Sequence, residues 1–258
     1  MLWAGPRLAV TLLTAIPLPG RRNPAGPPAR RVAAAAMYAA PAVGLLTGAL
    51  AAAVLLAAVR LGHTGPLLAA ALAIGTGAVA TRALHLDGLA DFADGLGSAK
   101  PAGQALDIMR RSDIGPFGVV TLILTLLIQV SALARAQERG YGPEAVLAAA
   151  VTARLAIMLA CRRSVPAARP GGLGALVAGS VHPVIAGGIT AAALAAAAGT
   201  GLASGAGWLL AIGMAAGLAA SLAVTALATR RLGGITGDVL GALAEIAATA
   251  CLVVTALS

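Results

Sequence analysis

The chain contains few charged and aromatic residues for its length. Charged residues make up 10% of its 258 residues and aromatic residues make up 2%. A soluble protein of this size needs far more polar surface. A surface that binds nucleic acid usually combines basic residues with aromatic side chains on which bases stack. The net charge of +9 therefore does not indicate a nucleic-acid partner.

Cysteine is also scarce, since Cys161 and Cys251 are the only two in the chain. They do not have the spacing of metal ligands, and a disulfide between them would have to cross most of a membrane. We expect two free thiols.

Most of the chain consists of long apolar runs. Hydrophobic residues make up 59% of the chain, and the mean hydropathy is +0.93. These values predict an all-α, polytopic membrane helix bundle in a single domain, 1–258. Two runs are weak, one because it is short and contains Arg154 and the other because it is rich in glycine, so we expect six or seven transmembrane helices. The runs lie at 32–59, 66–84, 115–134, 145–160 (short), 181–199 (glycine-rich), 207–228 and 239–257.

A further apolar stretch, residues 8–19, is too short to cross a membrane. Pro17 and Pro19 interrupt it, and no small-x-small cleavage site follows. This pattern favours a retained interfacial or re-entrant segment over a cleaved signal peptide.

Most basic residues fall on one side of the predicted bundle. With seven helices, only Arg60, Arg135 and Arg139 lie on the other side. The positive-inside rule assigns the more basic side to the cytoplasm. The acidic segment 82–118 and the glycine-rich, acidic motif 232–245 then lie at the same face and can converge. The residues on the basic side are Arg21, Arg22, Arg30, Arg31, Arg82, Lys100, Arg110, Arg111, Arg162, Arg163, Arg169, Arg230 and Arg231.

Three of the chain's nine carboxylates are concentrated in one short segment. Asp87, Asp91 and Asp94 have i, i+4, i+7 spacing, which places them within about 60° on one helical face. Like charges about 6 Å apart repel by roughly 2–3 kcal/mol per pair at an effective dielectric near 20. A stable cluster needs protonation, basic partners or a cation, and a divalent metal is the simplest solution.

A second acidic stretch begins the last apolar run. Asp238 and Glu245 are seven residues apart and share a helical face. A glycine-rich turn precedes them, and backbone amides at such a helix start can bind phosphate. The turn residues are Gly233, Gly234, Thr236 and Gly237.

Basic residues lie close to both acidic stretches. Arg110 and Arg111 can hold phosphate oxygens through bidentate hydrogen bonds, or they can serve only as topology anchors. His85 can be a ligand, a base or a hydrogen-bonding residue at a helix start. Asp107 can contact substrate or pair with an arginine. Carboxylates beside arginines suit Mg²⁺-assisted phosphoryl transfer.

These motifs together resemble the cobalamin synthase family. The acidic signature is His85-Leu-Asp-Gly-Leu-Ala-Asp-Phe-Ala-Asp-Gly, and four further segments follow the family's order over almost the whole chain. One departure is local: Arg111 stands where many members have an acid, which leaves the roles of Arg111 and Asp113 open. The four segments are Leu13-Thr-Ala-Ile-Pro-Leu-Pro19, Ile108-Met-Arg-Arg-Ser-Asp-Ile-Gly-Pro-Phe-Gly118, Ala168-Arg-Pro-Gly-Gly-Leu-Gly174 and Gly233-Gly-Ile-Thr-Gly-Asp238.

The resemblance implies an Mg²⁺-dependent transferase acting late in cobalamin biosynthesis, in a bacterial inner membrane with its active site facing the cytoplasm. It would join adenosylcobinamide-GDP to α-ribazole or its 5′-phosphate and release GMP, with Asp94 suggested as proton acceptor. The expected partners are the substrates and the bilayer; a second copy of the chain or other enzymes of the pathway are left open. The implied catalytic residues are Asp87, Asp91, Asp94 and Asp238, and these four with Glu245 would bind the metal. The implied substrate-binding residues are His85, Arg82, Arg110, Arg111, Gly233, Gly234, Thr236 and Gly237.

Two alternatives belong to other classes. CDP-alcohol phosphotransferases of phospholipid synthesis begin their motif Asp-x-x-Asp-Gly-x-x-Ala-Arg, whereas this chain has Asp-Gly-x-x-Asp-x-x-Asp-Gly from Asp87. An ion-coupled transporter commonly places acids near mid-membrane and contains internal repeats. Here the acids lie at one edge and no repeat is evident.

Overall fold

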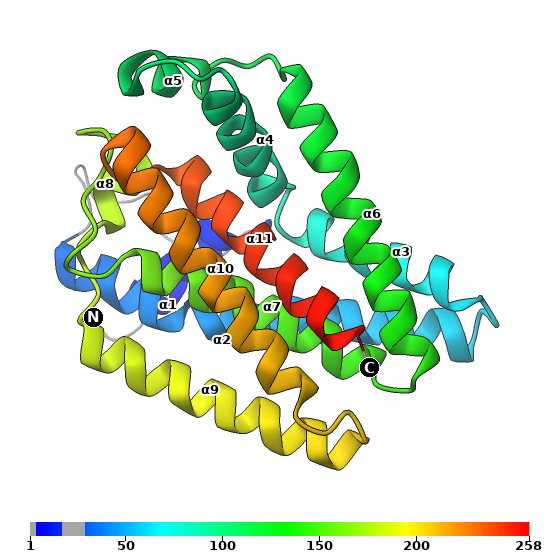
Figure 1. The fold of residues 1–258 in the computed structure, drawn as a ribbon. Helices are drawn as coiled ribbons and strands as arrows, with labels where there is room; N and C mark the ends of the chain where they lie inside the picture. Colours follow the sequence, from blue (N-terminus) through cyan, green and yellow to red (C-terminus); the bar gives the residue numbers. More distant parts are fainter. Residues whose placement is uncertain (1–3, 17–28, 258) are drawn as a thin grey trace.

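Helices form nearly all of the structure, a computed structural model that describes residues 4–16 and 29–257. Within those residues there is no β-strand, only isolated bridges between Arg162 and Val181 and between Ala167 and Ile235. The predicted all-α bundle is therefore confirmed (Figure 1). The helices are α1 (Ala4–Leu13), α2 (Arg30–Arg60), α3 (Pro66–Ala80), α4 (Leu84–Gly97), α5 (Ala102–Ile108), α6 (Pro116–Glu138), α7 (Gly142–Ala160), α8 (Gly172–Val177), α9 (Pro183–Ser204), α10 (Leu209–Leu232) and α11 (Gly237–Thr255).

Among the described residues, six helices are long and apolar enough to cross a membrane: α2, α6, α7, α9, α10 and α11. Helices α3 and α4 make a seventh crossing only as a pair bent by 88°. The prediction of six or seven helices is confirmed, but the expected weak points were wrong. The runs at 145–160 and 181–199 form the continuous helices α7 and α9, whereas the run at 66–84 is broken. The break between α3 and α4 arises from the backbone conformation of Arg82 and Ala83. A hydropathy profile therefore could not reveal it.

Small residues bring the central helices close together. A Cβ added to Gly44 or Gly48 of α2 would lie within about 3 Å of α7 atoms. Gly213 and Gly217 of α10 approach α11 in the same way. Both pairs have the G-x-x-x-G spacing that lets membrane helices pack backbone to backbone. Helix α11 thus lies in the centre, packed against α4, α6, α7 and α10 (Figure 1).

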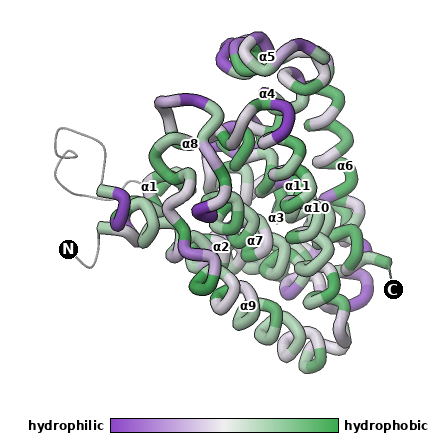
Figure 2. Tube along the Cα trace, turned by 60° about the vertical axis from the view of Figure 1, so that its left-hand side comes forward, coloured by the Kyte–Doolittle hydropathy of each residue, from purple (hydrophilic) through white to green (hydrophobic). Residues whose placement is uncertain are grey.

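The outer surface of the bundle is apolar. Figure 2 shows long hydrophobic stretches along the helices, with hydrophilic segments mainly at the turns between them. Helix α6 exposes a continuous apolar face, as expected where lipid replaces water. Its exposed side chains are Phe117, Val119, Val120, Ile123, Leu124, Leu127 and Ile128.

The N-terminal apolar stretch forms helix α1, which packs against α2. Its ten residues extend about 15 Å, half of what a crossing requires. Beyond it, the Ala15 N–H donates to the Ala80 carbonyl at 2.7 Å. The predicted short N-terminal segment is confirmed as a short apolar helix; Pro17 and Pro19 lie outside the described residues. Cys161 and Cys251 are both buried, free thiols, as expected.

Candidate active site

The site begins with the break between α3 and α4. Arg82 and Ala83 both have left-handed backbone, with φ of 53° and 55°. A non-glycine residue in this conformation costs roughly 1–2 kcal/mol. Such strain persists only where the surrounding structure enforces it, and it often occurs at functional sites. Here it turns α4 away from the direction of α3 and lays it across α11.

The crossing of α4 and α11 depends on two glycines. A Cβ added to Gly88 of α4 would lie 2.7 Å from the Asp238 carbonyl oxygen. A Cβ on Gly241 of α11 would lie 3.1 Å from the backbone of His85. Any larger residue at Gly88 would push the two helices apart. Asp87 flanks this contact, so the two acidic stretches meet as the sequence predicted.

Three carboxylates gather at the crossing. Asp87 is exposed, while Asp91 and Asp238 are half-buried. The charge of Asp91 is repelled by those of Asp87 and Asp238, and less strongly by that of Asp94. Asp87 and Asp238 also line one cavity, together with Gly237 and His85. The structure therefore brings together three of the four residues predicted to be catalytic.

A loop from the middle of the chain adds a cation to this cluster. Two hydrogen bonds join the loop to the turn before α11: the Ile235 N–H donates to the Pro166 carbonyl and the Ala168 N–H to the Ile235 carbonyl, each at 3.0 Å. A Cβ on Gly234 would lie 2.3 Å from the Pro166 carbonyl oxygen. The motif 168–174 is thereby fastened to the motif 233–238, and Arg169 is held beside Asp238.

Arg169 is attracted by Asp91 and Asp238. Burial and the nearby Arg110 lower the pKa of the Arg169 guanidinium, while Asp238, Asp107 and Asp91 oppose that shift. Its Nη2 donates to the Leu106 carbonyl, and its buried Nε has no hydrogen-bond partner among the described residues. Arg169 is therefore a cation whose charge acts on the carboxylates.

Arg169 is not among the site residues predicted from the sequence. In the sequence it is one of many basic residues on the predicted cytoplasmic side and a part of the motif 168–174. That motif was the available indication, because a glycine-rich loop with one arginine resembles an anion-binding loop. Its position opposite Asp91 depends on the pairing of two distant segments, which spacing alone does not reveal.

Asp94 has a different environment from Asp87 and Asp91. Its carboxylate accepts hydrogen bonds from the Gly115 N–H at 2.7 Å and the Gly118 N–H at 2.9 Å. These amides belong to the N-cap residue and the first turn of α6, so Asp94 caps that helix from outside. Asp94 is 8% exposed. A Cβ on either glycine would lie 2.5 Å from an Asp94 oxygen, so any larger residue at these two positions would clash with the carboxylate.

The turn before α11 is formed largely as its sequence predicts. Gly233 ends α10 with a φ of 86°, and Thr236 caps α11 by accepting a hydrogen bond from the Val239 N–H at 3.2 Å. The Thr236 hydroxyl also donates to the Asp238 carboxylate at 3.2 Å. Thr236 therefore orients Asp238, while Gly237 lines the cavity beside it.

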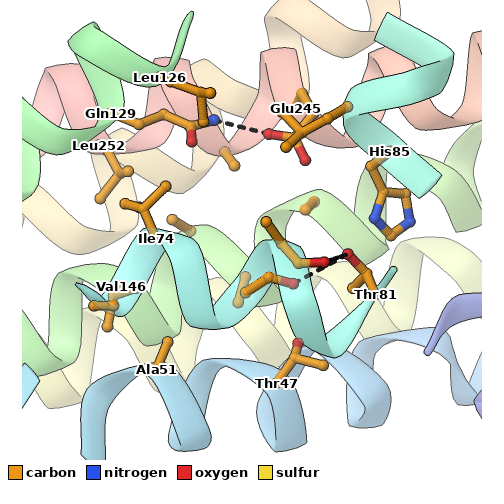
Figure 3. A pocket seen from close by; sticks show the side chains of 18 of the residues that line it. Thr47, Ala51, Ile74, Thr81, His85, Leu126, Gln129, Val146, Glu245 and Leu252 are labelled. Carbon is orange, nitrogen blue, oxygen red and sulfur yellow. Dashed lines mark hydrogen bonds between the residues drawn. The ribbon is translucent and has the colours of Figure 1, made fainter. Parts of the chain in front are cut away.

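Glu245 lies two turns further along α11 and faces a second cavity (Figure 3). Its carboxylate accepts a hydrogen bond from Gln129 Nε2 at 2.9 Å. Arg154 lines the same cavity and its charge attracts Glu245. Its side chain is 5% exposed and therefore stays inside the bundle. His85 borders both cavities. Glu245 is thus separated from the cluster of Asp87, Asp91 and Asp238.

The remaining predicted substrate contacts are exposed arginines around the site. Arg82 lies at the break before α4. Arg110 and Arg111 follow α5, and the charge of Arg110 acts on Arg169. These positions leave their guanidinium groups accessible to a charged ligand.

A divalent cation fits the chemistry of the aspartate cluster. As they stand, no three His, Cys, Asp or Glu side chains among residues 4–16 and 29–257 are grouped closely enough to share one ion. However, Asp87, Asp91 and Asp238 supply only carboxylate oxygens, the ligands that Mg²⁺ prefers. Their mutual repulsion is offset within the described residues chiefly by Arg169, so a cation would relieve it.

Comparison with known proteins gives a match that covers nearly the whole molecule. The family model described as cobalamin-5-phosphate synthase matches residues 5–256.

The chain belongs to this cobalamin synthase family.

Several relatives cover almost the entire chain. A protein of Frankia casuarinae is 43% identical, over 98% of this chain and 94% of its own length. Proteins of Bradyrhizobium diazoefficiens and Chlorobaculum tepidum are 40% and 37% identical, over 97% and 96% of this chain and 92% and 93% of their own lengths. All three are named adenosylcobinamide-GDP ribazoletransferase. No solved structure matches significantly. This member of the cobalamin synthase family is therefore a transferase of cobalamin biosynthesis.

Proposed function

We propose that this enzyme joins adenosylcobinamide-GDP to α-ribazole, or to its 5′-phosphate, and releases GMP. The names of the relatives support the two substrates. The observation that carries the proposal is the convergence of Asp87, Asp91 and Asp238 with Arg169 from three separate motifs. Neither alternative class from the sequence analysis has a structural observation in its favour.

Mg²⁺ is the proposed cofactor, held by Asp87, Asp91 and Asp238. When bound, it would neutralise charge on the pyrophosphate of the substrate. Asp94 and Glu245 were also expected to bind it. Because Asp94 caps α6 and Glu245 lines a separate cavity, we assign the metal to the other three.

The reaction forms one phosphorus–oxygen bond and breaks another. A ribose hydroxyl of α-ribazole attacks the phosphorus on the corrinoid side of the pyrophosphate, and the bond to the bridging oxygen breaks to release GMP. The hydroxyl proton passes to a carboxylate. Because Asp94 uses both oxygens to cap α6, we assign this acceptor role to Asp91.

The basic groups at the site serve the charged leaving group. Arg169 can donate an N–H to a phosphate oxygen, and Arg110 lies close enough for its charge to act on Arg169. Phosphoryl transfer depends mainly on positioning and charge neutralisation, which these groups provide. The turn Gly233–Gly237 adds backbone amides at the start of α11.

The enzyme is proposed to lie in a bacterial inner membrane with this site facing the cytoplasm. Basic residues concentrate at the end of the bundle where α2 and α9 begin and α10 ends. The positive-inside rule supports the orientation. An edge location also avoids the cost of burying the aspartates at mid-membrane, about 2.5–3.5 kcal/mol each.

GMP release tests the proposal directly. The enzyme in lipid nanodiscs is supplied with adenosylcobinamide-GDP, with and without α-ribazole, in Mg²⁺ and then in EDTA. We expect GMP only when α-ribazole and Mg²⁺ are both present, with a cobalamin as the second product. Release in EDTA would contradict the metal assignment, and absence of turnover by folded enzyme would contradict the function.

The variant Asp91→Asn tests the site. We expect GMP release to fall roughly 10²- to 10⁴-fold, because a proton acceptor and metal ligand is lost. Glu138→Gln is the matched control, since Glu138 pairs with Arg135 at 3.1 Å at the opposite end of the bundle. Near-normal turnover by Asp91→Asn would refute the assignment.

A further inference from the structure

A second basic pocket lies away from the aspartate cluster, where α2 and α9 begin. Arg30, Arg31 and Tyr38 of α2 line one side of it. Arg163, Ser180 and His182, from the segment between α7 and α9, line the other. The pocket shares no residue with the cavity of Asp87 and Asp238. Its lining among the described residues contains three arginines and no carboxylate, so its charge suits an anion.

Two polar atoms in this pocket are buried without a partner. The Ser180 hydroxyl and His182 Nδ1 make no hydrogen bond to any part of the chain that the structure describes, although Ser180 is only 9% exposed. Both residues are held in place by their backbones: the His182 N–H donates to the Tyr38 hydroxyl at 2.8 Å, and the Ser180 N–H donates to the Val177 carbonyl at 3.2 Å. Arg30 fastens the neighbouring Gly179 by donating to its carbonyl at 2.7 Å. Buried polar groups normally have partners, so these atoms indicate a ligand.

The start of α9 adds a third feature that favours an anion. His182 is the N-cap of this helix of 22 residues, and Pro183 occupies its first turn. The first amides of a helix lack partners within it, and they carry a partial positive charge. A phosphate seated here would contact arginines, a hydroxyl and the helix start together.

A separate apolar groove lies further along α2 and α9. Helix α7 packs against both helices and forms its floor. Helix α9 is the least buried of the six candidate spans, with 17% of its most apolar window inside the protein, and it lies at the edge of the bundle (Figure 1). The groove is lined by Pro41, Ala42 and Leu45 of α2, Leu147, Ala148 and Val151 of α7, Ala193, Ala196, Ala197 and Thr200 of α9, and Leu210 and Met214 of α10, with Glu144 at its far end.

The apolar groove begins within the reach of a lipid chain from the basic pocket. Ile185 lines the basic pocket and Ala193 lines the groove. At 1.5 Å per residue, they are separated by about 12 Å along α9. One leaflet of hydrocarbon is roughly 15 Å deep. An acyl chain that starts at the pocket therefore reaches the groove.

We propose that an anionic phospholipid binds between α2 and α9. Its phosphate occupies the pocket of Arg31, Arg163, Ser180 and His182, and one acyl chain follows the seam towards Ala193. The lipid completes the weakly packed edge of the bundle formed by α9.

Native mass spectrometry of purified protein can count the bound lipids. The protein is released from membranes with equal amounts of phosphatidylglycerol and phosphatidylcholine of identical chains. We expect one retained phosphatidylglycerol and little phosphatidylcholine. In the variant R31A/R163A, retention should fall roughly 20- to 30-fold, because two arginine–phosphate contacts are lost.

The control R230A/R231A removes the same two charges at the same end of the bundle, where α10 ends. It should retain phosphatidylglycerol like the wild type. Ser180→Ala does not change the charge of the protein, yet it should weaken the retention of phosphatidylglycerol about fivefold because a hydrogen bond to the phosphate is lost. Surface charge cannot explain such an effect.

Three outcomes would overturn the proposal. Equal retention of the two lipids by the wild type would exclude a headgroup site. An equal loss in R230A/R231A and R31A/R163A would reveal only general attraction to anionic lipid. Displacement of phosphatidylglycerol by millimolar GDP or inorganic phosphate would assign the pocket to a soluble phosphate.

Discussion

The three aspartates of α4 share one helical face but not one environment. Asp94 is held by two backbone amides of α6. Asp91 faces Asp87 and Asp238, with Arg169 as a partly compensating charge. Hydrogen-bonded carboxylates stabilise structure, whereas uncompensated ones are suited to bind a cation or a proton. One acidic signature therefore combines residues that build the site with residues that act in it.

The variant Asp94→Asn should lose stability. An amide side chain can accept one of the two N–H bonds, but its NH₂ group would face the other N–H. We expect a loss of about 2 kcal/mol, which lowers the apparent Tm by roughly 4–8 °C for a chain of this size. Thermal unfolding in detergent measures this, with Asp113→Asn, an exposed position, as control. An unchanged Tm with abolished GMP release would show that Asp94 acts in the chemistry instead.

Arg169 should not be replaceable by lysine. A lysine keeps the charge but cannot contact the Leu106 carbonyl and a phosphate oxygen from one planar group. We expect kcat/KM for GMP release to fall roughly 10- to 100-fold in Arg169→Lys and further in Arg169→Ala. Arg231→Lys is the control. Full activity of Arg169→Lys would show that Arg169 contributes only its positive charge.

At the scale of elements, the site depends on a break and a crossing. The strained residues Arg82 and Ala83 redirect α4, and Gly88 and Gly241 let it touch α11. The two hydrogen bonds of Ile235 and Ala168 then add the loop of Arg169. Elements far apart in the sequence thus share one site because small residues allow backbone contact.

Gly88→Ala tests the importance of the crossing. The added methyl group would lie 2.7 Å from the Asp238 carbonyl oxygen, so the helices must separate. Displacements of about 1 Å can cost roughly 10²-fold in rate, and we expect GMP release to fall by at least tenfold. Gly75→Ala on α3, where a Cβ meets no atom within 4 Å, should leave activity unchanged. Equal activities of the two variants would argue against a tight crossing.

At the scale of the whole molecule, charge asymmetry is expected to set the orientation of the bundle. The segments of Arg163 and Arg231 lie at the end where α2 begins, and His63 follows the far end of α2. Helix α9 is the least buried of the six candidate spans, and the proposed lipid would cover part of its surface.

Cysteine labelling tests this orientation. Cys161 and Cys251 are buried and should not react. In intact cells, a membrane-impermeant maleimide should label His63→Cys but not Arg231→Cys. Permeabilised cells should show labelling of Arg231→Cys as well, since access from the cytoplasm is then open. The opposite pattern would place the aspartate cluster outside the cytoplasm.

The sequence by itself determined the class of the molecule and the residue types at its site. Long apolar runs can be stable only in lipid, where helices satisfy their own backbone, and this predicted the bundle. Carboxylates are so costly in such a chain that their two concentrations indicated the site, and Asp87, Asp91 and Asp238 do converge. Local spacing and composition carry this information.

Only the tertiary structure decided which residues share a cavity. Asp94 and Asp91 are equivalent in helical spacing, yet the first turn of α6 approaches only Asp94. Glu245 shares a helical face with Asp238, yet Gln129 and Arg154 enclose it in another cavity. The break at Arg82 and the position of Arg169 likewise depend on contacts between distant segments. Such contacts arise from the packing of particular backbones, which periodicity along one chain segment does not encode.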